Sequence, residues 1–303
     1  MKQDAILLGP VVSEFFWELF RFAPLLPHFR RKKYKHSEVK YIILTREERF
    51  DLYGKWANIL VPLKIPNDYK TMWPNCHKLM GLKRNQYLTI SKMFYKKYAK
   101  DYKILEHLSP DVIKAKYCNK NQFPKNQMSY EWHPRERNVE LVNEYLPTDK
   151  PLVVISPRYR GDLKRNWPHW KTIFDMVADD TYLMNHYNFI LCGKDGEYIP
   201  DKQRRFLDLN DIKLDSQSSL AGLLLATMSK AYFTFGSQSA IPNISLLYGV
   251  EALEFGNQRI LHTTTYNVKR TPVTFIDDPK FNIKPKVIFT KFKESLRKKN
   301  KKR

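Results

Sequence analysis

Strand-like and helix-like segments alternate from the first residues of this 303-residue chain, and this alternation constrains its fold more than any other feature. Residues 4–9 form an apolar run that ends in glycine, and residues 39–45 and 59–62 read as two further short buried strands. Between them, residues 13–31 have apolar side chains at roughly helical spacing, broken by prolines, and residues 46–53 read as a short helix. Such alternation predicts an α/β fold with a parallel, doubly wound sheet.

The same alternation restarts after a basic, aromatic middle stretch, of which about 89–105 looks helical, and a polar linker at residues 119–137. Predicted strands in the second half span 151–156, 187–193, 211–214, 231–236 and 250–255, and predicted helices span 170–178, 219–230 and 238–248. We therefore predict two facing Rossmann-like domains with a cleft between them. Their expected bounds are 1–148 and 149–270, followed by a C-terminal segment, 271–303, that returns toward the first domain and ends in a basic tail.

Cysteine usage and the absence of long apolar runs indicate the cellular compartment in which we expect the protein. Cys76, Cys118 and Cys192 are far apart and form no C-x-x-C pair, so neither a zinc site nor a disulfide framework is indicated. No apolar stretch approaches the roughly 20 residues of a membrane span, and no signal-peptide pattern opens the chain. We expect a cytoplasmic protein.

The formal net charge of +22 points to an anionic partner. Nucleic acid is one candidate and an anionic membrane surface is another. A lysine-rich proteome, in which every protein is somewhat basic, would explain the same charge without any partner.

Polar residues follow the ends of three predicted strands in the second half. Arg158, Arg160 and Lys164 come directly after the strand at 151–156, where cations would suit a diphosphate, although a solvated basic loop has the same composition. Gly193 and Glu197 follow the next strand; glycine lets a ligand approach the backbone, and a carboxylate can accept hydrogen bonds from a ribose diol. An ordinary strand-ending turn with an exposed acidic side chain, without any ligand, would have the same sequence.

The third strand end leads into a helix. The predicted anion-binding residues there are Gly236, Ser237, Gln238, Ser239 and Asn243. A helix N-terminus has unpaired N–H groups and the positive end of the helix dipole, so it is suited to phosphate. An ordinary serine N-cap would look the same in sequence.

Taken in order, these motifs resemble the heptosyltransferase-like branch of the GT-B glycosyltransferases over residues 152–256. The matching features are Lys164 before the pair Trp167-Pro168, then Gly193 with Glu197, and then the helix start Ser219-Leu220. The family's last motif has an acid, a hydroxyl residue, a glycine and, three residues further on, a histidine. This chain has Gln238, Ser239, Ala240 and Asn243 there.

The resemblance implies a nucleotide-sugar donor held by the second domain and an acceptor held by the first. It places the loop after Gly9 at the cleft, with Gly9 itself as a donor-binding residue. It gives Glu14, or alternatively Glu18, the role of the base that deprotonates the acceptor. No metal and no cofactor beyond the nucleotide-sugar co-substrate are then expected, because cations and helix N–H groups can hold the diphosphate.

The acceptor is expected at the basic, aromatic part of the first half. Residues 78–120 contain eleven Lys or Arg against three Asp or Glu, with tyrosines interleaved, and the tail 291–303 adds eight more Lys or Arg. Lysines neutralise phosphates, and tyrosines stack on displaced bases. The candidate acceptor-binding residues are Trp17, Lys92, Lys96, Lys97 and Tyr98.

Three functions remain open at this point. The first is a phage-type DNA glycosyltransferase that modifies a hydroxymethylated base. The second is a transferase that acts on lipopolysaccharide or another surface glycan at an anionic membrane face. The third is an inactive relic of the fold that binds nucleic acid, in which the substitutions in the last motif mark lost chemistry.

Overall fold

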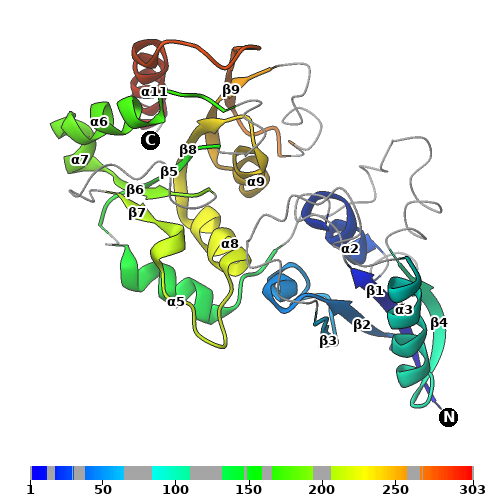
Figure 1. The fold of residues 1–303 in the computed structure, drawn as a ribbon. Helices are drawn as coiled ribbons and strands as arrows, with labels where there is room; N and C mark the ends of the chain where they lie inside the picture. Colours follow the sequence, from blue (N-terminus) through cyan, green and yellow to red (C-terminus); the bar gives the residue numbers. More distant parts are fainter. Residues whose placement is uncertain are drawn as a thin grey trace. The chain divides into compact units, whose positions relative to one another are not determined.

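The computed structural model of the chain describes residues 2–11, 18–28, 30, 38–64, 84–109, 132–146, 149–158, 166–193, 206–257, 267 and 269–301. The chain divides into two compact units, which are described separately (Figure 1). The first comprises Met1–Arg135 with Gln217–Gly222, and the second comprises Glu136–Ser216 with Leu223–Arg303. No helix within the described ranges is long and apolar enough to cross a membrane.

A four-stranded parallel sheet in the order β3-β2-β1-β4 forms the centre of the first unit. Its strands are β1 (Gln3–Val11), β2 (Lys40–Thr45), β3 (Ile59–Pro62) and β4 (Tyr102–Leu108). Between β1 and β2 lie the π-helical turn η1 (Glu18–Phe22), the 3-10 turn η2 (Ala23–Leu25) and the short α2 (Leu26–His28). The remaining helices are the 3-10 helix η4 (Glu47–Leu52) and α3 (Arg84–Tyr98).

The core of the first unit lies between this sheet and α3. Tyr87 and Phe94, seven residues apart on α3, pack against Ala5 and Leu7 of β1 and Ile42 of β2. The helix spacing places both aromatic rings on one face, and that face covers the sheet.

The carboxylate of Asp51 binds two segments of the first unit that are distant from it in sequence. This buried carboxylate accepts hydrogen bonds from the backbone N–H of Arg135 at 2.6 Å and from its guanidinium at 3.1 Å. The hydroxyl of Ser219 donates to the same carboxylate at 3.0 Å. Arg135 ends the long segment of this unit, and Ser219 belongs to the short segment that rejoins it, so one side chain anchors both.

A six-stranded parallel sheet in the order β10-β9-β8-β5-β6-β7 forms the second unit. Its strands are β5 (Leu152–Ser156), β6 (Asn188–Leu191), β7 (Leu207–Asp208), β8 (Ala231–Ser237), β9 (Glu251–Gly256) and β10 (Val273–Asp277). The other elements are α5 (Glu136–Tyr145), α6 (Trp170–Asp179), α7 (Thr181–His186), the 3-10 turn η7 (Leu209–Asp211), α8 (Leu220–Lys230), α9 (Ala240–Tyr248) and α11 (Pro285–Asn300). Counted within this sheet, the strand order is the 3-2-1-4-5-6 order of the Rossmann fold.

Alternate residues of the central strands divide the second unit into two layers. Val153, Phe235 and Phe255 face a core shared with α6 and α11. The residues between them in sequence point to the opposite face, where α9 packs against β8 and β9. Figure 1 shows α6 and α11 on one side of the sheet and α8 and α9 on the other.

The α/β class and the parallel sheets predicted from the sequence are confirmed, and three local predictions are wrong. The predicted strand at 211–214 is absent: the strand is β7, four residues earlier, and η7 follows it. The helix predicted over 89–105 ends at Tyr98, and its second half is β4. The helix predicted over 238–248 begins at Ala240, because Gln238 and Ser239 form the turn that precedes it.

The expected domain bounds also differ from the structure. The helix α5, assigned from the sequence to the first domain, belongs to the second unit. The segment 271–303 does not return to the first unit. Instead, β10 pairs with β9, and α11 inserts Ile288, Phe292 and Leu296 into the core of the second unit.

The position of α11 predicts how its side chains affect stability. Phe292 is fully buried and stacks on Phe235, with ring centroids 4.9 Å apart. We expect Phe292→Ala to lower the free energy of unfolding by about 3–5 kcal/mol, measured by urea denaturation. Val287 on the same helix is 46% exposed, and Val287→Ala should change stability by less than about 0.5 kcal/mol. Equal, small effects of both substitutions would contradict this packing.

Candidate functional site

The candidate site lies at the topological switch point of the second sheet, where β5 and β8 are neighbours. The chain leaves β5 toward β6 on one side and leaves β8 toward β9 on the other. In open α/β sheets this divergence opens a crevice at the carboxyl ends of the strands, and ligands bind there. Ser156 ends β5, and Gly236 and Ser237 end β8, so predicted residues from two motifs meet at this edge.

Close approach of the two strand ends requires glycine at position 236. A Cβ atom on Gly236 would lie 2.8 Å from both the Cβ and the carbonyl oxygen of Ser156, well inside van der Waals contact. Gly193 at the end of β6 is restricted in the same way, since its Cβ would lie 2.8 Å from the carbonyl oxygen of Pro157. Both predicted glycines therefore shape the backbone of this edge.

The N-terminus of α9 opens at the same place. Its N-cap residue, Ser239, makes no side-chain capping hydrogen bond; its hydroxyl instead lies 3.1 Å from the hydroxyl of Ser156. The first-turn N–H groups and the positive end of the helix dipole thus lie at the switch point. This is the arrangement that binds anions at helix N-termini.

Arg158 brings a cation to this edge. Its side chain is 7% exposed, and its guanidinium donates a hydrogen bond to the carbonyl oxygen of Gln238 at 3.2 Å. The predicted cation after β5 and the predicted turn before α9 are therefore in direct contact. A partly desolvated guanidinium next to a helix N-terminus adds to the attraction for an anion.

Gln238 and Asn243 stabilise the turn itself. The side-chain oxygen of Gln238 accepts a hydrogen bond from the backbone N–H of Asn257 at 3.1 Å, and the amide of Asn243 donates to the carbonyl oxygen of Ser239 at 2.7 Å. These contacts explain how the loop keeps its shape with an amide at each of these two positions.

Several buried polar atoms at this edge have no hydrogen-bond partner among the described residues. They are Oγ1 of Thr234, Oγ of Ser237, Nε2 of Gln238, Oδ1 of Asn243 and both carboxylate oxygens of Glu254. Folded proteins leave few such atoms unpaired in their interiors, so a group of them beside a helix N-terminus indicates a place for a polar ligand or ordered water.

Glu254 was not predicted from the sequence. It is fully buried in β9, and this burial raises its pKa to about 8, although the backbone N–H of Ser239, which is directed at the carboxylate, opposes the rise. The strand predicted at 250–255 contains two glutamates, Glu251 and Glu254, and the sequence does not show which of them is buried.

Gly9 of the first unit lies near the end of β1, where the pairing with β2 shifts register between Leu8 and Val11. Its φ is +116°, and a Cβ atom there would collide with the carbonyl oxygen of Leu44, so this position requires glycine. The ring of His107, near the end of β4, lies 2.9 Å from the Gly9 carbonyl oxygen, and burial lowers the pKa of this histidine. Five predicted site residues lie outside the described residues: Glu14, Trp17, Arg160, Lys164 and Glu197.

Glu18, the alternative base, lies in the interior of the first unit with no exposed surface. Its carboxylate accepts hydrogen bonds from Tyr53 at 2.6 Å, Arg49 at 2.8 Å and Thr45 at 2.9 Å. Burial raises the pKa of Glu18, while the charge of Arg49 and the two hydroxyl hydrogen bonds oppose the rise. These contacts give Glu18 a structural role, joining η1 to β2 and η4.

The predicted acceptor-binding lysines are displayed along α3. Lys92, Lys96 and Lys97 are exposed, whereas Tyr98 is half-buried and packs edge-on against Phe94 with ring centroids 5.3 Å apart. Burial raises the pKa of Tyr98. Large apolar side chains accompany the lysines on the exposed surface: Leu88 is 46% exposed, Met93 65% and Tyr95 42%.

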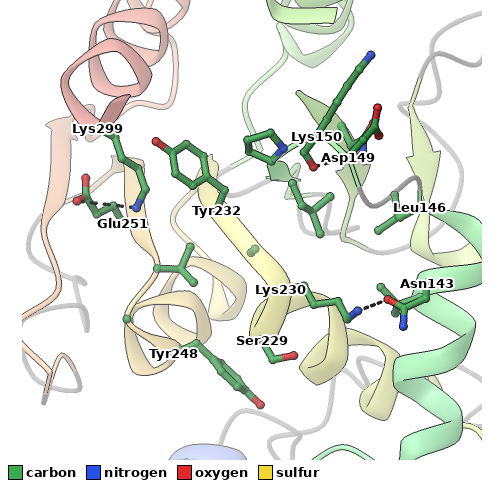
Figure 2. A pocket seen from close by; sticks show the side chains of 17 residues that line it. Asn143, Leu146, Asp149, Lys150, Ser229, Lys230, Tyr232, Tyr248, Glu251 and Lys299 are labelled. Atoms are coloured by element: carbon green, nitrogen blue, oxygen red, sulfur yellow. Dashed lines mark hydrogen bonds and ion pairs between the residues drawn. The ribbon is translucent and has the colours of Figure 1, made fainter. Parts of the chain in front are cut away.

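A second hollow of about 790 Å³ lies at the opposite, amino-terminal edge of the second sheet (Figure 2). Figure 2 shows Lys299 directed at Glu251, with their charged atoms 3.8 Å apart, and Lys230 hydrogen-bonded to Asn143. Both lysines are already engaged by neighbouring side chains. Within the described part of the chain, no group of three His, Cys, Asp or Glu residues could hold a metal ion.

Comparison with known proteins connects this geometry to a fold family. A scan against protein-family models and a search of curated proteins return no match. Among solved structures, the chain is similar to the Escherichia coli ADP-heptose lps heptosyltransferase II at a TM-score of 0.60 and 10% identity, covering 98% of this chain and 100% of that one.

Two further solved structures have a similar fold. A glycosyl transferase family 9 protein from Veillonella parvula has a TM-score of 0.54 at 11% identity, with 98% and 89% of the two chains covered. The Escherichia coli heptosyltransferase WaaC with ADP has a TM-score of 0.51 at 10% identity, with 96% and 99% covered. The fold is therefore that of the GT-B glycosyltransferases, with two Rossmann-like units.

The contacts of Glu18 predict that it stabilises the first unit. We expect Glu18→Ala to lower the free energy of unfolding by about 3–5 kcal/mol, because it leaves the buried guanidinium of Arg49 without its carboxylate. Asp4, in an exposed ion pair with Lys103, provides the control: Asp4→Ala should cost less than about 0.5 kcal/mol. If Glu18→Ala left the free energy of unfolding unchanged, the structural role of Glu18 would be contradicted. Glu18 would then again be a candidate for the catalytic base.

Proposed function

We propose that this protein is a glycosyltransferase that transfers a sugar from a nucleotide-sugar donor to a hydroxyl acceptor, with the donor bound at the switch point of the second sheet. The observation that carries the proposal is the N-terminus of α9 beside the buried Arg158. The unpaired polar atoms around it add to the case. The similarity in fold to heptosyltransferases supports a nucleotide-linked donor, since one of those structures contains ADP.

The proposed reaction is a displacement at the anomeric carbon of the sugar. The acceptor oxygen forms a bond to that carbon, the bond from carbon to the diphosphate oxygen breaks, and the acceptor proton passes to a carboxylate. Negative charge grows on the departing diphosphate, and the N–H groups of α9 with Arg158 would stabilise it. Arg160 and Lys164 are proposed as further cations, Glu197 as the ribose contact and Glu14 as the base. No bound metal enters this scheme.

A nucleotide screen tests the donor site. We expect one of UDP, GDP, ADP or CMP to raise the thermal midpoint, because a ligand that binds only the folded state stabilises it by mass action. Arg158→Ala or Lys164→Ala should abolish the shift. Lys171→Ala removes a lysine of α6 that pairs with Asp175 on the surface and should leave the shift intact.

Two results would contradict the donor proposal. One is the absence of a shift with every nucleotide and the matching nucleotide sugars. The other is a nucleotide shift that survives Arg158→Ala unchanged. If duplex DNA alone stabilised the protein, a nucleic-acid-binding relic of the fold would become the better account.

We propose that the acceptor is a surface glycan presented at an anionic membrane. On α3, lysines alternate with exposed Leu88, Met93 and Tyr95, and this mixture suits an interface with anionic lipid better than a nucleic-acid backbone. One of the solved structures with a similar fold is named as an lps heptosyltransferase. The hydroxymethylated DNA base remains the second candidate, resting on the net charge of +22.

Substitutions on α3 separate the two acceptors. For a membrane acceptor, Met93→Ser should weaken binding to vesicles that contain anionic lipid, because it removes apolar contact from the exposed face. Lys92→Ala with Lys96→Ala should weaken it as well, and the effect should diminish at high salt. For a DNA acceptor, the lysine substitutions should weaken binding to duplex DNA while Met93→Ser leaves it unchanged. Co-sedimentation with vesicles and filter binding of DNA give the two measurements.

A further inference from the structure

Glu254 lies in a row of three residues that crosses the switch point. Parallel pairing places Ser156 of β5 opposite Gly236 of β8, and Gly236 opposite Glu254 of β9. Because Gly236 has no side chain, Ser156 approaches it closely and no side chain stands between Ser156 and Glu254 in this row. Ser239, the N-cap of α9, spans this row: its hydroxyl lies by Ser156, and its backbone N–H is directed at the Glu254 carboxylate.

This arrangement puts an acid directly beneath a helix N-terminus. In a capping box, a glutamate of the first turn reaches back to the N-cap N–H. Here the carboxylate comes from the neighbouring strand. The approach of the Ser239 N–H falls short of a full hydrogen bond, and neither carboxylate oxygen has a partner among the described residues.

The charged groups around Glu254 do not offset the negative charge that its carboxylate would carry when ionised. Within the described residues, β8 and α9 bear no charged side chain, and α8 has only Lys230, at the amino-terminal edge. Arg158 donates to the Gln238 carbonyl oxygen, and on β10 Asp277 pairs with Gly256, two residues beyond Glu254. Asp278 follows, also acidic, with a carboxylate that accepts from the backbone of Ile283. The core on the far side of the sheet is apolar.

We propose that Glu254 is a positioning residue of the anion site: as a carboxylic acid it supports the first turn of α9, and as a carboxylate it expels the diphosphate bound there. The ionised side chain would cancel the positive end of the helix dipole and repel a phosphate above it. Burial supports this by raising the pKa of Glu254 to about 8, so the acid form prevails at neutral pH. The inference rests on the proposed nucleotide-sugar site. It goes beyond that site because it links the affinity for the donor to the protonation of Glu254.

Stability without ligand gives the first test. The folded protein keeps the Glu254 proton up to about pH 8, whereas an unfolded glutamate loses it near 4.5. The contribution of Glu254 to the stability of the wild type therefore falls as pH rises from about 4.5 to about 8 and levels off above that. The isosteric Glu254→Gln lacks this loss, so its melting temperature relative to the wild type should rise steadily over the same range. Glu251→Gln, on the same strand and paired with Lys299, is the matched control without such a trend.

Binding of inorganic pyrophosphate by calorimetry gives the second test. The ratio of dissociation constants, wild type over Glu254→Gln, should rise at least about threefold between pH 7 and pH 9.5. The titration of the ligand cancels in this ratio. A ratio constant within about twofold, or a pH-independent difference in melting temperature, would overturn the inference while leaving the donor site standing. Pyrophosphate binding with the expected ratio, but no nucleotide binding, would refute the proposed function and keep the role of Glu254. Absence of pyrophosphate binding would refute both.

Discussion

The backbone contact between the ends of β5 and β8 is the constraint on which the rest of the candidate site depends. Only a residue without a Cβ atom can occupy position 236 opposite Ser156. That contact fixes where the chain turns into α9 and brings Ser239 over the strand ends. The sheet topology therefore determines where the anion site lies, and the individual polar side chains contribute to it in second place.

Two buried glutamates show how differently one residue type can be used in a single chain. Glu18 has three donors around its carboxylate, and these repay the cost of burial. Glu254 has a single imperfect donor, so its burial remains a net cost to folding. Proteins retain such a cost mainly where a ligand or a reaction uses the group, and the neighbouring helix N-terminus suggests that use.

The sequence predicted the parts of the fold that leave a periodic or glycine-terminated trace. Gly193 and Gly236 lie within two residues of the ends of β6 and β8, as expected, whereas β1 continues beyond Gly9 to Val11. The side chain of Glu254 was missed because strands buried on both faces show no alternation, so the orientation of one acid is not visible. The buried contacts of Glu18 were not predicted because its partners, Thr45, Arg49 and Tyr53, are 27–35 residues away.

The strand β4 was missed because the helical pattern of α3 runs into it without a break, and the pairing of β4 with β1 is decided by tertiary contact. The helix α11 was overlooked for another reason. Its lysines dominate the composition and indicated a solvated tail, while Ile288, Phe292 and Leu296 follow one another at four-residue intervals along a single buried line.

This position of α11 has a consequence for synthesis on the ribosome. The central strands of the second unit are translated well before the helix that covers one of their faces. Until residues 285–300 leave the exit tunnel, Phe235 lacks its stacking partner Phe292, and Trp170 of α6 is the earlier-made aromatic partner on that side. The nascent chain therefore presents part of this aromatic surface from the time Phe235 is made until α11 emerges. The last part of the unit to be made is the part that removes this surface from chaperones and from other unfinished chains.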